Sequence, residues 1–128
     1  MQVSGPLVFN STQQDIVTME KTIHHELDDI VSIIRTTNPE KIILFGSRAT
    51  GRGDKDSDID LLIVASSDAP PLERRLKLRR LLKKFDRRFG LDLLVYTPDE
   101  FNMLKGEPSS FISSTLKTGV VLYDSQPN

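Results

Sequence analysis

Residues 41–65 read KIILFGSRATGRGDKDSDIDLLIVA, and this stretch decides the fold. Its two short apolar runs, 41–45 and 59–65, are typical of buried β-strands. The first run leads directly into Gly46 and Ser47. A glycine lets the backbone approach a ligand closely, and free N–H groups with a hydroxyl suit a phosphate group. The pattern predicts a strand, a phosphate-binding turn and a second strand.

The second strand opens with two carboxylates, Asp58 and Asp60. Because side chains alternate along a strand, both lie on one face, with Cα atoms about 6.6 Å apart at roughly 3.3 Å per residue. Carboxylates so placed can share two hard cations such as Mg²⁺ or Mn²⁺. Two such ions clamp both oxygens of an in-line phosphoryl displacement. The spacing therefore favours nucleotidyl transfer.

A third strand is predicted at residues 91–96, which read LDLLVY. Asp92 stands near its start among apolar neighbours, where an isolated charge would be costly. A cationic partner or a metal ion explains this carboxylate most simply. We expect Asp92 to join the first two carboxylates.

These motifs resemble those of the DNA polymerase beta-like nucleotidyltransferases, and specifically of the minimal nucleotidyltransferases. The similarity covers about residues 12–124 and rests on FGSRATG at 45–51, SDIDL at 57–61, Asp92 and, more weakly, the C-terminal residues 111–123. Thr50 departs from the pattern, since many family members carry a basic residue there. The departure concerns the phosphate contacts and leaves the metal site unaffected.

The resemblance implies roles for six residues. Asp58, Asp60 and Asp92 would be the catalytic residues and the ligands of two Mg²⁺ ions, with Mn²⁺ as a substitute. Gly46, Ser47 and Arg48 would bind the nucleotide.

The resemblance also implies a biological role, namely an antitoxin that AMPylates a helical HEPN-type toxin with AMP from ATP. Two alternatives stay open. The protein could neutralise its partner by binding alone, or the same chemistry could act on RNA or on an aminoglycoside.

Composition predicts one small domain. The chain has 128 residues, no cysteine and a net charge of −1. We expect a flexible arm at 1–10, a single domain at 11–124 and a tail at 125–128. The apolar runs are too short to span a bilayer and no signal peptide is evident, so the expected location is the cytoplasm, without membrane contact.

The remaining elements predict an α/β (α+β) fold with an αββαβ core: one small mixed sheet with helices packed against it. A long helix should begin near Ser11 or Thr12 and stop at Asn38-Pro39. A capping box at 97–100 predicts another helix start. A short helix near 109–117 and a strand at 120–123 should complete the chain.

A basic helix is predicted to start at Pro71 and to end at Gly90, which suits the position after a helix. Its expected inner face is Leu72, Leu76, Phe85 and Phe89. Residues 74–88 hold nine of the seventeen Lys and Arg and one acid, a net charge of +8. Such a run is usually a solvated face, although it could also bind phosphate or an acidic partner. Without a stacking platform on this helix, the sequence does not favour nucleic acid.

Other metal and phosphate motifs fit poorly. The turn at 46–53 lacks the Lys of a Walker A loop, and the alternating aspartates at 54–60 lack the Gly and Glu of an EF-hand. His24, His25 and Glu26 suggest a zinc helix, but residue 29 is Asp rather than a second ligand His.

Overall fold

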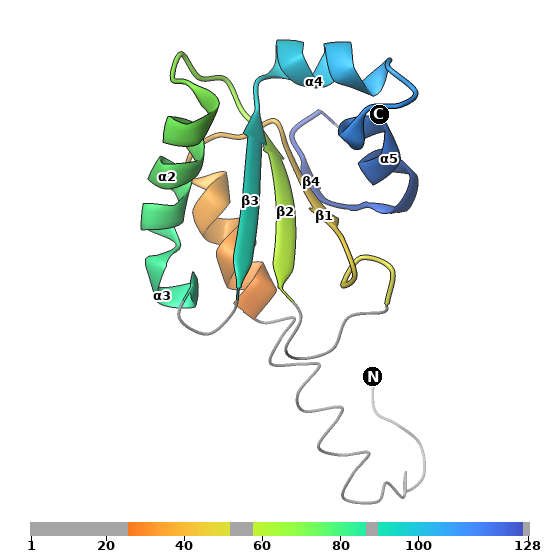
Figure 1. Ribbon diagram of the computed structural model, residues 1–128. Coiled ribbons are helices and arrows are strands. Elements are labelled where there is room, and N and C mark those ends of the chain that lie inside the picture. Colours follow the sequence, from red (N-terminus) through yellow and green to blue (C-terminus); the bar gives the residue numbers. More distant parts are fainter. Residues whose placement is uncertain (1–25, 52–57, 87–89, 127–128) are drawn as a thin grey trace, which may run out of the picture.

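The computed structural model describes residues 26–51, 58–86 and 90–126 (Figure 1). The predicted start of the first helix and the arm at 1–10 therefore lie outside the described residues, as do His24, His25, Asp54, Asp56 and Phe89. A helix occupies residues 26–35. The later elements are β1 Lys41–Phe45, β2 Ile59–Val64, α2 Pro71–Leu81, α3 Lys83–Asp86, β3 Leu91–Tyr96, α4 Pro98–Lys105, α5 Phe111–Thr118 and β4 Val120–Asp124.

The four strands form one mixed sheet in the order β3-β2-β1-β4. β1 is antiparallel to both β2 and β4, whereas β2 and β3 are parallel. A parallel pair needs a long crossover, which α2 and α3 provide. The predicted α/β class with a mixed sheet is thus confirmed.

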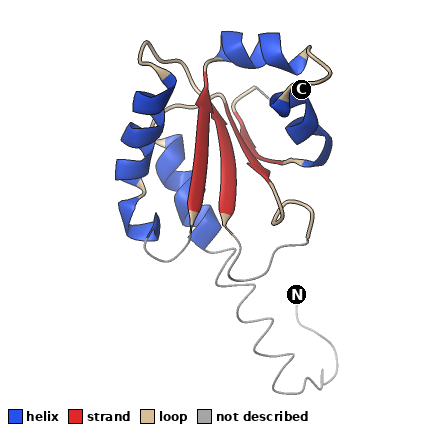
Figure 2. Cartoon of the chain, in the orientation of Figure 1, coloured by secondary structure: helices blue, strands red, loops and turns tan. Residues whose placement is uncertain are grey.

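Helices cover both faces of the sheet (Figure 2). Alternation along β2 explains why both faces are apolar. Ile59, Leu61 and Ile63 belong to the core under α2, α3 and the helix at 26–35. Leu62 and Val64 belong to the core under α4 and α5. β2 is therefore apolar at four successive positions, 61–64, and its one polar residue, Asp60, lies near its N-terminal end.

The predicted strands and caps agree closely with the structure. β2 ends one residue earlier than predicted and β4 ends one residue later. The capping box of α4 is confirmed, because Thr97 Oγ1 accepts from the Glu100 backbone N–H and Glu100 Oε1 accepts from the Thr97 backbone N–H. No helix in the described part of the chain is long and apolar enough to cross a membrane.

The prediction for the basic helix was wrong in two respects. Leu72 and Leu76 are 57% and 42% exposed, whereas Phe85 is buried as predicted, together with Leu78 and Leu82, which were not predicted. The helix is also interrupted at Leu82, which separates α2 from α3. The predicted end at Gly90 follows residues 87–89, which lie outside the described residues, and it stays a prediction. The reason for the shifted inner face is that Arg74, one turn before Leu78, occupies the inward position.

Arg74 joins α2 to β3 and α4. Its side chain is only 8% exposed, and it forms an ion pair with Glu100 at 2.7 Å. The same guanidinium donates to the backbone carbonyls of Ala69 at 2.7 Å and Val95 at 3.3 Å. Arg79 donates to the Leu91 carbonyl at 3.0 Å. The basic run is therefore partly structural, because these two arginines cover the outer edge of β3.

We expect Arg74→Ala to lower the free energy of unfolding by about 2–3 kcal/mol, since it removes charge-assisted hydrogen bonds and leaves buried carbonyls unpaired. The exposed Arg80 on the same helix is the matched control, and Arg80→Ala should cost less than about 0.5 kcal/mol. Urea denaturation measures both changes. Equal stability of the two variants would contradict a structural role for Arg74.

This interaction should also depend on pH. Hydrogen bonds from Arg74, and next from the Thr97 backbone, hold the pKa of Glu100 below its ordinary value of 4.5. A lowered folded-state pKa means that the stabilisation is complete above the ordinary value and is lost as pH falls through the lowered one. Denaturation of the wild type below pH 4.5 should therefore show a loss of stability that is smaller in Arg74→Ala.

Candidate active site

Two of the predicted carboxylates lie directly opposite each other. In the parallel register of β2 and β3, Asp60 pairs with Asp92. Neighbouring strands are about 4.8 Å apart, so these residues are adjacent across the strands. Asp58 precedes β2 by one residue and, by alternation, shares the face of Asp60. All three predicted acids thus belong to one end of the sheet.

Burial and two neighbouring carboxylates act on Asp60. Partial burial raises the pKa of Asp60 above its ordinary value, and the charges of Asp92 and Asp58 raise it further. Ionised Asp60 is therefore unfavourable beside its neighbours, and a cation bound there would relieve that cost.

Gly46 makes room for Asp60. It has a positive φ of 78°, a conformation that favours glycine, and it directly follows Phe45, the last residue of β1, which pairs with Asp60. A Cβ at residue 46 would overlap Asp60 Oδ2 and would lie 3.0 Å from Asp60 Cγ. The residue predicted to contact phosphate is thus also the one that lets the Asp60 carboxylate lie against the backbone.

Gly90 makes room for Asp58 in the same way, a role that sequence reasoning missed. A Cβ at residue 90 would lie 2.7 Å from Asp58 Cγ. The Ile59 backbone N–H donates to the Gly90 carbonyl at 2.8 Å, which fixes the two strand starts side by side. The available signal was the position of Gly90 two residues before Asp92, matching Asp58 two residues before Asp60.

Ser47 and Arg48 lie in the turn after β1. The Ala49 N–H donates to the Gly46 carbonyl at 3.1 Å, and Thr50 Oγ1 donates to the Ser47 carbonyl at 3.1 Å. Ser47 is exposed and Arg48 is half-buried. This turn starts beside Asp60, because Phe45 pairs with Asp60 in the register of β1 and β2.

The donor set suits a divalent metal ion, since carboxylate oxygens are the ligands that Mg²⁺ and Mn²⁺ prefer. In the described part of the chain, however, no three acidic, His or Cys side chains converge as a ready metal cluster. Carboxylates on one end of the sheet repel one another, and a bound cation would relieve that repulsion. The room above Gly46 and the raised pKa of Asp60 fit such a cation.

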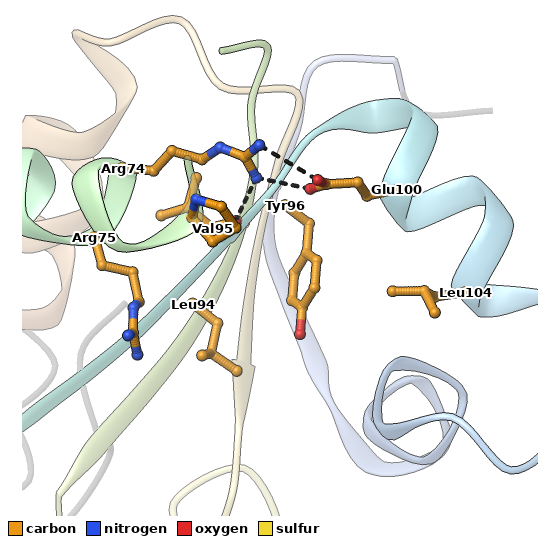
Figure 3. A pocket seen from close by; sticks show the side chains of 8 residues that line it. Arg74, Arg75, Leu94, Val95, Tyr96, Glu100 and Leu104 are labelled. Atoms are coloured by element: carbon orange, nitrogen blue, oxygen red, sulfur yellow. Dashed lines mark hydrogen bonds and ion pairs between the residues drawn. The ribbon is translucent and has the colours of Figure 1, made fainter. Parts of the chain in front are cut away.

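A cavity of about 270 Å³ lies away from these carboxylates, at the C-terminal end of β3 (Figure 3). Arg74 and Glu100 form its polar side, and Leu94, Tyr96 and Leu104 contribute apolar surface. The hydrogen bonds of Arg74 to Glu100 and Val95 occupy its guanidinium there. This cavity belongs to the junction of α2 with α4 rather than to the carboxylate site.

Sequence comparison places these residues within a known family. A family model described as "Polymerase beta, Nucleotidyltransferase" matches residues 28–128. A candidate protein adenylyltransferase of Methanocaldococcus jannaschii is 31% identical over 61 residues, which is 48% of this chain. The match spans 61% of that relative's length.

Two solved structures share the fold. A candidate nucleotidyltransferase from Sulfolobus solfataricus superimposes with a TM-score of 0.53 and 22% identity, covering 94% of each chain. A toxin–antitoxin complex with AMP-PNP contains a chain with a TM-score of 0.50 and 19% identity, with 77% of this chain and 73% of that chain covered. At these identities the likeness concerns the fold alone.

Proposed function

Because the chain belongs to the polymerase beta nucleotidyltransferase family, we propose that it is a metal-dependent adenylyltransferase that moves AMP from ATP to a hydroxyl group of a partner protein. The observation that carries this proposal is the register that sets Asp60 opposite Asp92, beside Gly46. The carboxylates and the glycine turn all lie within the matched residues 28–128.

In this proposal the turn after β1 binds the triphosphate. Gly46 and Ser47 contact the β- and γ-phosphates through backbone N–H groups and the exposed Ser47 hydroxyl. Arg48 adds a charge-assisted contact to a phosphate oxygen. The turn adjoins Asp60, so the α-phosphate would lie between the turn and the carboxylates.

The carboxylates complete the reaction centre. Asp58, Asp60 and Asp92 would hold two Mg²⁺ ions, for which Mn²⁺ could substitute. Bound ions supply charge neutralisation at the phosphate oxygens and polarise the attacking hydroxyl. Asp92, on the edge strand, aligns that hydroxyl and accepts its proton. The acceptor oxygen bonds to the α-phosphorus, and pyrophosphate leaves.

We further propose that the protein is an antitoxin and that the acceptor is a HEPN-type helical toxin. The name of the Methanocaldococcus jannaschii relative supports protein as the acceptor. The toxin–antitoxin complex with AMP-PNP supports both the kind of partner and the nucleotide. The HEPN class follows from the resemblance to the minimal nucleotidyltransferases.

The test is to incubate the full chain with Mg·ATP and a candidate HEPN-type partner protein, and then to measure the partner's mass by mass spectrometry. We expect its mass to rise by one or a few AMP units and its toxicity to fall. The matched control is Asp60→Asn, which should bind the partner without modifying it.

Other outcomes of this experiment would distinguish the alternative functions. An unmodified but fully neutralised partner would contradict catalysis and leave a stoichiometric binder. Labelled AMP on RNA or on an aminoglycoside, with none on the protein, would move the acceptor to those classes. The absence of pyrophosphate release with every acceptor would exclude the enzyme.

A further inference from the structure

Aromatic side chains lie beside the carboxylates on the same face of the sheet. Asp92 pairs with Asp60, and Asp60 pairs with Phe45, so the three residues form one row over β3, β2 and β1. Paired residues on adjacent strands point to the same face. Phe45 lies in the core on the side of α4 and α5, which is therefore also the face of the carboxylates.

Phe111 extends this row beyond Phe45. The two rings meet edge to face, with centroids 5.4 Å apart and an interplanar angle of 84°. Phe45 is nearly buried, whereas Phe111 is 51% exposed. The row thus ends in a phenyl ring that is accessible to solvent.

The start of α5 holds Phe111 in place. Ser110 caps the helix by accepting from the Ser113 N–H at 3.0 Å, and its own hydroxyl donates to the Leu104 carbonyl at 2.6 Å. Ile112 and Thr115 are buried and fasten α5 to the sheet. An exposed ring on a fixed helix start is a rigid surface that needs little ordering before a ligand packs on it.

The position of Phe111 distinguishes it from the other exposed apolar residues. Among the described residues, the other large apolar side chains exposed on α4, α5 and β4 are aliphatic: Met103, Leu116, Val120 and Val121. Phe111 is aromatic and contacts the ring that immediately precedes Gly46. It is therefore the exposed ring next to the proposed phosphate-binding turn.

We propose that Phe111 is the stacking surface for the base of the nucleotide. The inference rests on the proposed function, in which Gly46 and Ser47 bind the phosphates. Stacking on an aromatic ring is tolerant of base identity, because every base has a π-face. Phe111 should therefore raise affinity for ATP and GTP alike rather than select adenine.

The test separates the base from the phosphates. Isothermal titration with Mg²⁺ compares ATP with inorganic tripolyphosphate, which has no base. Phe111→Ala should weaken ATP binding about 10- to 100-fold, with tripolyphosphate binding unchanged. Phe111→Tyr should retain the wild-type affinity for ATP. Leu116→Ala, on the same helix and 40% exposed, is the matched control and should change neither affinity.

A spectroscopic arm uses the absence of tryptophan from the chain. Phe111→Trp introduces a single indole, whose fluorescence should change on addition of Mg·ATP and remain constant with tripolyphosphate. Unchanged ATP affinity in Phe111→Ala, or equal weakening for both ligands, would overturn the stacking role while the proposed function stands. A wild type that binds neither ligand would overturn both proposals.

Discussion

Replacing Asp60 with Asn is expected to reduce nucleotidyl transfer by about 10³-fold or more. Asp60 lies between Asp58 along its strand and Asp92 across the sheet, so it is the central ligand of the proposed metal site. Loss of an anionic ligand removes several kcal/mol of charge stabilisation in the transition state, and each 1.4 kcal/mol is about tenfold in rate. Pyrophosphate release from Mg·ATP with the partner present measures the effect.

The same substitution should stabilise the metal-free protein. The raised pKa of Asp60 in the folded state means that its ionised form destabilises the fold. The protein is therefore most stable while Asp60 is protonated, and it loses this stability as pH rises through the raised pKa. Asp60→Asn should therefore melt at a higher temperature than the wild type at pH 7 in EDTA. The difference should vanish below pH 3.8, the ordinary pKa of the carboxyl group.

The exposed Asp68 provides a matched control, since it lies in the loop between β2 and α2. Asp68→Asn should leave both transfer and melting temperature unchanged within the error of the measurements. Full activity of a well-folded Asp60→Asn variant would rule out the metal assignment. A lower melting temperature in EDTA would contradict the electrostatic account.

Gly46→Ala is expected to reduce transfer by about 100-fold, because a new Cβ would occupy the place of Asp60 Oδ2 and displace the carboxylate. A misplacement of about 1 Å in a reaction centre can cost roughly that factor. The positive φ of Gly46 adds a second effect, since an L-residue there costs about 1–2 kcal/mol.

Gly51→Ala separates the two effects. Gly51 has nearly the same φ of 75°, but a Cβ there would meet no described residue within 4 Å. Both alanine variants should therefore lose similar stability in urea denaturation, whereas only Gly46→Ala should lose transfer beyond a few-fold. Comparable activity of the two variants would show that the Gly46 contact with Asp60 is unimportant.

The strands could be predicted from the sequence almost to the residue because their apolar runs are short and bounded by turn residues. The three carboxylates could be chosen for the same reason, since Asp60 and Asp92 interrupt apolar runs near their starts and Asp58 directly precedes the first of them. The register of Asp60 with Asp92 could not be predicted, because β2 and β3 are separated by α2 and α3. Pairing over that separation depends on how the whole sheet packs.

The buried face of α2 could not be predicted from hydropathy. Leu72 and Leu76 are more apolar than Arg74, yet Arg74 is the buried side chain near the helix start. The helix passes the end of β3 at that point, where unpaired carbonyls and Glu100 favour a guanidinium over a leucine. Hydropathy describes the average environment of a side chain and carries no information about the partners that meet it.

The arginines of α2 also affect which edge of the sheet can pair with an additional strand. With Arg74 and Arg79 bound to the carbonyls of Val95 and Leu91, two acceptors on the outer edge of β3 are already occupied, which makes that edge less suitable for pairing with another strand. In the described sheet β4 is the opposite edge. This favours β4 over β3 as the edge at which a strand of another polypeptide would pair, on the side of the sheet away from the carboxylate-bearing strands.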